Sequence, residues 1–442
     1  MAWGKRQGVS DWTGRLAEND PGLTSLLLMK NRVMETSSWR ELCDSIAHNH
    51  VLNELKASGH KLEPESVSAF SNMLKHNKAL KRLAIGDSTF GDEGLTLLAP
   101  GLAENAGLEA IELDYKGITS EGVSTLREVF LKNKVLRSIS LSRNSIKDEG
   151  LSKLSSIFGE AGVNLERVDL SSIEVGDVGM KALGSALLKE DVYIESLNLA
   201  DNPSMTGQSV ATLWTVLCRP HNKIKYLELD GCPLAFTDES ASAFSASLSD
   251  SNCRLESLSL NDLHLDEQQA KTLAAAVVGC PVLGQVRIRH SGLDNEAIKI
   301  LAHSSVGRDI DLSGNRINGQ GLFTVLTSSH CKIVKLGLFN NKIAEGIHFP
   351  TKISEEAEKG EVLCSSLKEL DLAANNLPEQ WMISLLVALR DHPNLLPSLQ
   401  TLVLGGNENS ARLREDNFEL LNELQLRQVS LHVVCDTTSG GA

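Results

Sequence analysis

A unit of strand, turn and helix is repeated from one end of the chain to the other, and this repeat constrains the fold more than any other feature. Residues 135–162, VLRSISLSRNSIKDEGLSKLSSIFGEAG, show it clearly. The first half follows L-x-x-L-x-L-x-x-N-x-L, and Ile139 lies between serines, as in a strand with one buried face. The second half places Leu151, Leu154 and Phe158 on one face of an amphipathic helix.

The first apolar residue of this pattern, here called the anchor, marks about fifteen units, spaced mostly by 28 to 31 residues. Neither half of a unit can bury its apolar side alone, so neighbouring units must stack into one continuous core. We therefore expect a single solenoid of repeats. The anchors are Leu23, Leu52, Leu80, Leu108, Leu136, Leu165, Ile194, Ile224, Leu255, Leu283, Gly307, Ile333, Leu367, Leu399 and Leu426.

The pattern is the leucine-rich-repeat signature, and the long, helix-containing unit resembles the ribonuclease-inhibitor-like subclass of these repeats. The resemblance covers nearly all of the chain. It implies an α/β horseshoe of about 15 repeats, with a parallel β-sheet on the concave face and helices on the convex face. Close strands inside and bulkier helices outside would produce that curvature. Such a resemblance is specific for the fold and says little about function.

Segments outside the pattern set the expected boundaries of the repeat domain. Residues 1–22 are expected to cap the apolar face of the first repeat, with partner contact through Trp3 as an alternative. The leucine-rich-repeat domain is expected over residues 23–434, followed by a flexible tail at 435–442.

The regularity loosens in the last third of the chain. Residues 344–366 read as a charged insertion in an extended repeat, with a short helix near 354–363. Insertions in solenoids map to one edge, so this one is either a binding edge or a tolerated elongation. The next helix is predicted to begin at Pro378 and to bury Trp381.

The asparagine of the pattern is replaced in five units. Asparagine at this position pairs turn backbone groups that would otherwise be buried without partners. Turns that lack it are expected to be more solvated or differently shaped. The replaced positions hold Ser88, Lys116, Ile173, Leu263 and Ser291.

Charge and cysteine usage limit the classes of partner and compartment. The net charge of −14 comes in good part from acidic residues at helix starts, and no basic stripe suited to nucleic acid is present. The eight cysteines form no C-x-x-C motif and read as buried thiols. No signal peptide and no apolar run near 18 residues are found. We expect a protein of the cytoplasm or nucleus that does not bind membranes.

Known catalytic and ligand-binding motifs are absent from the sequence. It contains no HExxH, Walker A, G-x-S-x-G or EF-hand pattern. The glycine-rich segment 314–321 matches the turn and helix start of the other repeats, and the histidines are scattered without metal-ligand spacing. No catalytic residue, cofactor, metal or small-molecule substrate is therefore expected, and the chain is not expected to be an enzyme.

Strand alternation assigns a set of side chains to the concave face. Residues on either side of a core position in a strand point away from the helices. Aromatic and arginine side chains in this set are the types that dominate protein interfaces. The candidate partner-binding residues are Glu112, Asp114, Tyr115, Asp169, Tyr226, Glu228, Asp230, Arg287, Arg289, His290 and Phe339.

These candidates suggest a protein partner with a basic segment facing the carboxylates and an acidic one facing Arg287 and Arg289. The alternative is that they are ordinary solvated strand faces, in which Arg287 and Asp311 on neighbouring strands satisfy each other.

Three functions are compatible with such a repeat array. The first is a non-enzymatic protein-protein interaction scaffold, alone or in a larger assembly. The second is a GTPase activator similar to the Ran GTPase-activating family, which shares the repeat subclass but ends in a strongly acidic tail, unlike residues 436–442 here. The third resembles tropomodulin-type actin regulators, which carry actin-binding helices for which this chain has no room. A sensor of the NOD-like type would need a nucleotide-binding domain, which is absent.

Overall fold

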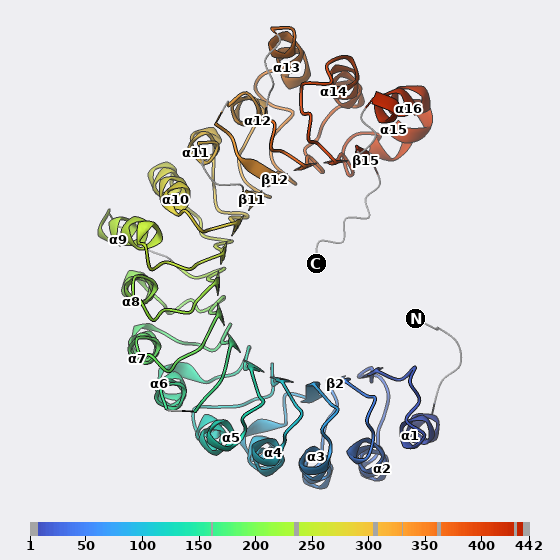
Figure 1. Ribbon diagram of the computed structural model, residues 1–442, viewed down its shortest axis with the longest axis vertical. Coiled ribbons are helices and arrows are strands. Elements are labelled where there is room, and N and C mark those ends of the chain that lie inside the picture. Colours follow the sequence, from blue (N-terminus) through green and yellow to red (C-terminus); the bar gives the residue numbers. More distant parts are fainter. Residues whose placement is uncertain are drawn as a thin grey trace. The chain divides into compact units, whose positions relative to one another are not determined.

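A computed structural model describes residues 8–160, 162–233, 238–303, 308–328, 330–359, 364–427 and 431–435. The chain divides into two compact units, Met1–Tyr226 and Leu227–Ala442. Within each unit the described strands pair in parallel and in chain order, with each strand followed by its helix (Figure 1). The described residues hold fifteen strands, which confirms an α/β leucine-rich-repeat solenoid of about 15 repeats.

The first unit alternates strands along one side with helices along the other. Its helices are α1 Val9–Ala17, α2 Thr36–Ala47, α3 Pro64–His76, α4 Gly91–Glu104, η1 Gly122–Thr125, α5 Leu126–Lys132, α6 Lys147–Phe158, α7 Asp177–Leu187 and α8 Gly207–Leu217. Its strands are β1 Ser25–Leu27, β2 Glu54–Ser58, β3 Arg82–Gly86, β4 Ala110–Glu112, β5 Ser138–Ser140, β6 Arg167–Asp169 and β7 Ser196–Asn198. Strand β8, Tyr226–Glu228, lies at the boundary of the two units.

The second unit repeats this alternation. Its helices are α9 Asp238–Ser249, α10 Glu267–Gly279, α11 Asn295–Leu301, α12 Gly319–Leu326, α13 Phe349–Ala357, α14 Glu379–Asp391, α15 Ser410–Asp416 and α16 Phe418–Arg427. Its strands are β9 Ser257–Ser259, β10 Gln285–Arg287, β11 Arg308–Asp311, β12 Ile333–Gly337, β13 Glu369–Asp371, β14 Thr401–Val403 and β15 His432–Val434.

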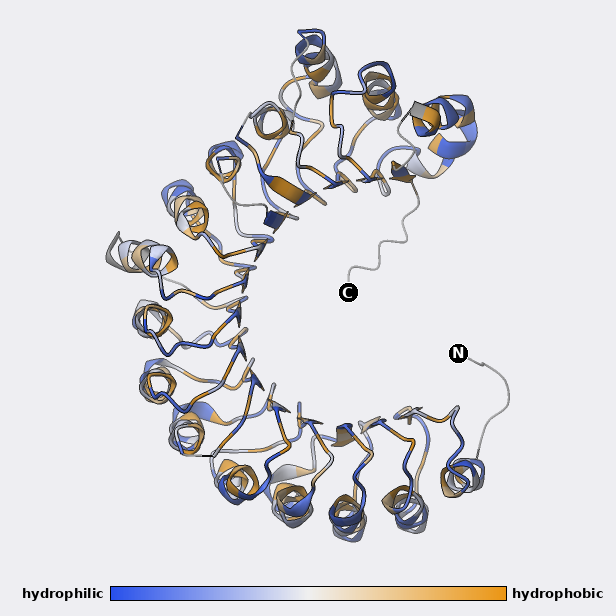
Figure 2. Cartoon of the chain, viewed as in Figure 1, coloured by the Kyte–Doolittle hydropathy of each residue, from blue (hydrophilic) through white to orange (hydrophobic). Residues whose placement is uncertain are grey.

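The core of each unit lies between its strands and its helices. The predicted helix stripe is buried: Leu151, Leu154 and Phe158 of α6 are each at most 2% exposed. Figure 2 shows hydrophobic residues on both layers of each unit. Burial of these aliphatic side chains supplies about 25 cal/mol per Å² of apolar surface removed from water. The prediction of the core residues from helical and strand periodicity is confirmed.

The predicted anchors are buried, with one error and one outside the described residues. Leu426 was expected to anchor the last repeat, but it lies in α16 and is 80% exposed. The last strand is β15, whose Val433 pairs with Leu402 of β14. In the sequence, Leu426, Val429 and Leu431 fit L-x-x-L-x-L, but this match is out of register with β15. Gly307 falls outside the described residues.

The asparagines of the pattern join each repeat to the one before it. Asn144 donates its amide hydrogens to the carbonyls of Leu113 and Leu141, and its Oδ1 accepts the N–H groups of Lys116 and Ile118. The turn at Lys116 lacks its own asparagine, but Asn144 of the following repeat pairs its N–H groups. No additional water is needed there.

Of the two alternatives expected at the replaced positions, a more solvated turn or a differently shaped one, the first is consequently wrong for four of the five. Lys116, Ile173, Leu263 and Ser291 are all buried, and Ser88 alone of the five is exposed. At Ser291 the hydroxyl donates to the carbonyl of Leu260 and accepts the N–H of Leu263, so it takes over the bonds of an asparagine.

A second asparagine ladder, which the sequence analysis missed, joins the loops that lead from helix to strand. Its members lie three residues before successive anchors and are buried. Asn105 donates to the carbonyls of Leu74 and Asn77, and its Oδ1 accepts the N–H groups of Gly107 and Leu108. The members are Asn49, Asn77, Asn105 and Asn133.

Acidic residues at helix starts bind the following repeat. Oδ1 of Asp148 in α6 accepts the N–H groups of Gly176 and Gly179 at the start of α7. Oδ1 of Asp177 in α7 likewise accepts the N–H groups of Thr206 and Ser209 at the start of α8. These carboxylates pair N–H groups that a helix leaves free at its N-terminus. The prediction that part of the net charge is structural is thereby supported, although the helix served belongs to the neighbouring repeat.

The segment read as an insertion holds the helix of its own repeat. Helix α13 begins at Phe349, earlier than the predicted 354–363, because Pro350 in its first turn favours helix initiation. Phe349 and Ile353 are buried, and Phe349 stacks on Trp381 with ring centroids 5.7 Å apart. The predicted helix start at Pro378 and the burial of Trp381 are confirmed. Residues 360–363 lie outside the described residues.

The N-terminal segment forms helix α1, which packs against α2 and buries Trp12 and Leu16. The guanidinium of Arg32 lies 4.3 Å from the centre of the Trp12 ring. Trp3 and residues 436–442 of the expected tail fall outside the described residues, so the alternatives for them stay predictions.

Replacing Asn105 by alanine is expected to lower the free energy of unfolding by roughly 2–4 kcal/mol, because it leaves two carbonyls and two N–H groups unpaired in a buried loop. Urea unfolding followed by circular dichroism measures the change. Asn53→Ala, at an exposed loop position, is the control and should have little effect. Equal midpoints for the two variants would contradict a structural role for this ladder.

Candidate interaction surface

The strand faces that point away from the helices carry the candidate residues. In β4, β5 and β7 the middle residue is buried and its two neighbours are partly accessible, as alternation predicts. The structure therefore places the predicted side chains on one accessible face of each unit, here called its inner face.

The inner face of the first unit holds a network of carboxylates and serines. Asp114 accepts hydrogen bonds from the hydroxyl of Ser140 and the N–H of Ser142. Asp169 accepts both the N–H and the hydroxyl of Ser171, at 2.9 and 2.7 Å. Burial, aided by the charge of Asp169, raises the pKa of Asp114 above its ordinary range. The network is anionic and partly desolvated.

Lys116 is a buried cation beside this network. It occupies a replaced asparagine position, is 3% exposed, and its Nζ lies 3.4 Å from the hydroxyl of Ser58. Burial lowers the pKa of Lys116, while the charges of Asp114, Asp87 and Glu112 act in the opposite direction. From the sequence, Lys116 was noted only as a residue that replaces the asparagine of the pattern. The buried ammonium group of Lys116 therefore balances part of the negative charge of this network.

Two tyrosines project from the first unit. Tyr115 is 64% exposed and adopts a left-handed backbone conformation with φ of 54°, while its N–H donates to the carbonyl of Ser142. Tyr226, in the strand at the end of the unit, is 43% exposed. Large exposed aromatic side chains on a polar surface are suited to burial against a partner.

The acidic candidates at the start of the second unit differ in their accessibility. Glu228 is exposed. Asp230 is bound to the next strand turn, because its carboxylate accepts the backbone N–H of Asn261 at 2.9 Å and the side-chain amide of Asn261 at 2.8 Å. Asp230 therefore holds the strand turn in place and has less freedom to meet a partner.

The arginines expected to form a basic site are in a mixed environment. Arg287 lies opposite Asp311 in the strand register, as predicted. Asp311 nevertheless forms its ion pair with Arg289, whose Nη2 and Nε lie 2.6 and 2.8 Å from Oδ2 of Asp311. Among the described residues, Arg287 has no ion-pair partner, and its side chain is exposed. Nearby, His290 and Phe339 are also exposed.

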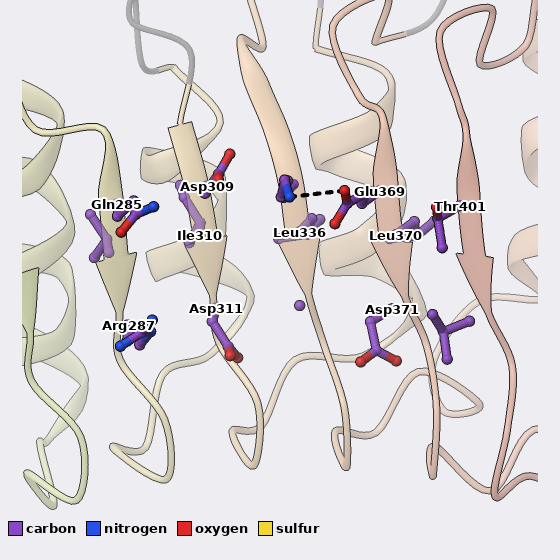
Figure 3. A pocket seen from close by; sticks show the side chains of 14 residues that line it. Gln285, Arg287, Asp309, Ile310, Asp311, Leu336, Glu369, Leu370, Asp371 and Thr401 are labelled. Carbon is purple, nitrogen blue, oxygen red and sulfur yellow. Dashed lines mark ion pairs between the residues drawn. The ribbon is translucent and has the colours of Figure 1, made fainter. Parts of the chain in front are cut away.

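A shallow hollow of ≈ 310 Å³ opens on the inner face across β10 to β14 (Figure 3). Two rows of side chains, one from each accessible position of the strands, border it. The rows in strand register are Gln285, Asp309, Lys335, Glu369 and Thr401, and then Arg287, Asp311, Gly337, Asp371 and Val403.

Gly337 opens the middle of this hollow. It has no side chain, and a Cβ there would lie 3.0 Å from Oδ1 of Asp311. In the other row, Lys335 and Glu369 form an ion pair at 2.9 Å. A link between Gly337 and Asp371 was not predicted from the sequence. That link depends on the strand register, which a single repeat does not reveal.

Two carboxylates of the hollow have perturbed titration. Burial, with a further contribution from the charge of Asp311, raises the pKa of Asp371, although a hydrogen bond from the N–H of Ala373 acts against this. Burial also raises the pKa of Asp309, where Lys335 acts in the opposite direction. The hollow thus holds negative charge that the chain itself compensates incompletely.

Metal binding and membrane insertion have no structural counterpart in the described part of the chain. No cluster of three or more histidine, cysteine, aspartate or glutamate side chains there could hold a metal ion. None of the helices there is both long and apolar enough to cross a bilayer.

A family model described as Leucine Rich repeat matches residues 76–99 and 132–155, which contain β3 and β5. The chain has the leucine-rich-repeat fold. Human NACHT, LRR and PYD domains-containing protein 13 is similar to this leucine-rich-repeat chain, with 28% identity over 180 residues. The match covers 39% of the chain and 17% of that relative, so the chain spans well under two thirds of the relative's length.

Solved structures similar to this leucine-rich-repeat protein include the leucine-rich repeat-containing protein LegL7 from Legionella pneumophila, with 18% identity and a TM-score of 0.44 over 69% of this chain and 87% of that one. The TLR13–ssRNA13 complex gives 16% identity and a TM-score of 0.42, over 85% and 55% of the two chains. Leiomodin-1 actin-binding site 2 gives 14% identity and a TM-score of 0.24, over 37% and 80%.

Asp371→Asn is expected to raise the urea midpoint of unfolding at pH 7. Because the folded chain raises the pKa of Asp371, the unfolded chain ionises first, and the native state loses stability as pH rises from 3.8 through the raised pKa. Asparagine keeps an oxygen for the N–H of Ala373 but carries no charge. Its advantage over the unsubstituted chain should therefore disappear below pH 3.8.

The matched control for that measurement is Asp44→Asn on the exposed face of α2, which should shift the midpoint little and equally at both pH values. A lower midpoint for Asp371→Asn at pH 7 would show that the ionised carboxylate stabilises the hollow.

Proposed function

We propose that this chain is a non-enzymatic interaction scaffold of the ribonuclease-inhibitor-like subclass, which binds a protein partner through its inner faces, alone or within a larger assembly. The observation that carries the proposal is the regular presentation of charged side chains, in register, on successive strands whose intervening residues form the core. Solenoids use such extended concave surfaces for binding. A rigid core behind the strands keeps this surface preorganised.

In the first unit the proposed partner feature is a basic segment. Glu112 ends β4, Asp114 follows it by two residues, and Asp169 lies in β6, with β5 between the two strands. Asp114 is partly desolvated already. An ammonium or guanidinium group from a partner would favour the ionised form of this carboxylate. Such complementarity would determine orientation and association rate more than affinity. Tyr115 supplies an exposed aromatic contact beside the acidic network.

In the second unit the hollow suits a basic side chain better than the acidic segment expected from Arg287 and Arg289. Arg289 is already paired with Asp311, and Asp371 lies on the other side of Gly337 in the same row. A lysine or arginine of the partner would fit above Gly337, between these two carboxylates. Arg287 would then meet an acidic group of the partner at the end of the row.

Three classes of partner are not expected for this chain. Anionic inner faces repel a polyanion, so nucleic acid is not proposed as a partner, and neither is a membrane or a small-molecule substrate. Eight free cysteines, seven of them buried, favour a reducing compartment, the cytoplasm or the nucleus.

Glu112→Lys is expected to weaken binding of a fluorescein-labelled lysine-rich nonapeptide by about tenfold at low salt, because it reverses one of the negative charges on the inner face of the first unit. Fluorescence anisotropy measures the dissociation constant, and the difference should shrink as salt is added. Glu18→Lys has the same net charge change at the exposed end of α1 and serves as the control.

Equal weakening by Glu112→Lys and Glu18→Lys would mean that net charge, and not the inner face, attracts the peptide. Affinity capture from the source cell with the unsubstituted chain and both variants extends the test to native partners. A partner retained by all three chains would place binding elsewhere. Acceleration of single-turnover GTP hydrolysis across a panel of small GTPases would contradict the non-enzymatic assignment.

A further inference from the structure

Two cysteine sulfurs from neighbouring repeats lie against each other in the second unit. The Sγ atoms of Cys331 and Cys364 are 3.4 Å apart, and each residue is only 4% exposed. Cys331 precedes β12 by two residues, and Cys364 precedes β13 by five. The pair therefore joins the two loops that lead into the central strands of the hollow.

Cys364 occupies the loop position, three residues before its anchor, that carries the second asparagine ladder in the first unit, and Cys331 lies one residue closer to its own anchor, Ile333. Backbone N–H groups that asparagine Oδ1 accepts there are met here by sulfur: Cys331 accepts the N–H of Ile333, and Cys364 accepts that of Leu367. A thiol lacks the second donor with which asparagine binds the preceding repeat. Packing alone therefore does not account for two adjacent cysteines in these loops.

Fixed backbone holds the two sulfurs together. The hydroxyl of Ser366 donates to the carbonyls of Cys331 and Ile333, at 3.1 and 3.0 Å. The thiol of Cys364 points at Cys331, to which it donates a hydrogen bond. That hydrogen bond lowers the pKa of Cys331, so the thiolate needed for reaction is favoured on this residue.

We propose that Cys331 and Cys364 form an intramolecular disulfide when the chain meets a hydroperoxide, and that this bond locks the loops entering β12 and β13. Closure requires the two sulfurs to approach from 3.4 Å to about 2.05 Å, which small side-chain rotations can supply. Hydrogen peroxide is small enough to reach a site of low exposure. Lone buried thiols such as Cys43, whose pKa burial raises, lack both the partner and the thiolate.

The reaction has two balanced steps. The thiolate of Cys331 attacks one oxygen of hydrogen peroxide, an S–O bond forms as the O–O bond breaks, and hydroxide leaves and takes up a proton to become water. The thiol of Cys364 then loses its proton and attacks Sγ of Cys331. The S–S bond forms as the S–O bond breaks, and the leaving hydroxide takes up that proton to become a second water. Two thiols are oxidised, and one peroxide is reduced to two waters.

The disulfide would act on the hollow without occupying it. Lys335 and Glu369, paired across β12 and β13, lie directly after the two cross-linked loops. A bond that closes the loop between residues 331 and 364 restricts the unfolded chain and resists separation of these repeats. Oxidation would thereby hold the inner face of this part of the unit in one geometry.

The test is peptide mapping of the purified full chain after hydrogen peroxide under native conditions, with unreacted thiols blocked before digestion. We expect an intact-mass loss of about 2 Da for each bond, from two hydrogens, and a Cys331–Cys364 cross-linked peptide that dithiothreitol removes. Cys364→Ser should leave Cys331 as a sulfenic acid that dimedone labels. Cys43→Ser is the matched control and should form the cross-linked peptide to the same extent.

Three results would overturn the proposal. These are absence of the Cys331–Cys364 peptide, progression of Cys331 to sulfinic acid without cross-linking, and a cross-link only between Cys253 and Cys280, whose thiols also hydrogen-bond each other. Mapping of the unsubstituted chain decides the matter even if a serine variant fails to fold. The outcome does not depend on whether the inner face binds a partner.

Discussion

Hydrogen bonds from the side chains of one repeat to the backbone of the next are the interactions on which each unit depends. Apolar burial drives the stacking, but it leaves the turns and loop carbonyls without water. Asn144 shows how this cost is removed, because one amide pairs groups in its own turn and in the preceding one. Asp148 pairs the helix start of the following repeat. The repeat that holds Asn144 and Asp148 is therefore hydrogen-bonded to both of its neighbours.

This dependence explains which parts of the fold could be predicted. The apolar stripes and anchors have fixed spacing, so the sequence predicts them repeat by repeat. The structure confirms the anchors in its described part except Leu426, which lies in α16. The satisfaction of a turn depends on the next repeat, about 28 residues away, and the expectation of solvated turns at Ile173 and Ser291 was wrong for that reason. The second asparagine ladder could have been found by aligning the residues three positions before each anchor.

The candidate surface was only partly predictable for a related reason. Alternation indicated which side chains leave the core, but pairing within the surface depends on register and on side-chain rotamers. Arg287 lies opposite Asp311, yet Arg289 reaches the carboxylate because its side chain extends back along the strand face. The hollow needs Gly337 and Asp371 in one row, and these residues are separated by the longest repeat of the chain.

The two-sided bonding of each repeat also limits how such a chain can change in length during evolution. A residue added to or removed from a strand or turn would shift the asparagine and aspartate bonds toward both neighbours at once. The helix side tolerates change more readily, since its contacts are mainly apolar. The long repeat follows this rule: its additional residues surround α13, while β12 and β13 keep their register. Length variants of this protein should accordingly differ on the helical side and conserve the geometry of the strands.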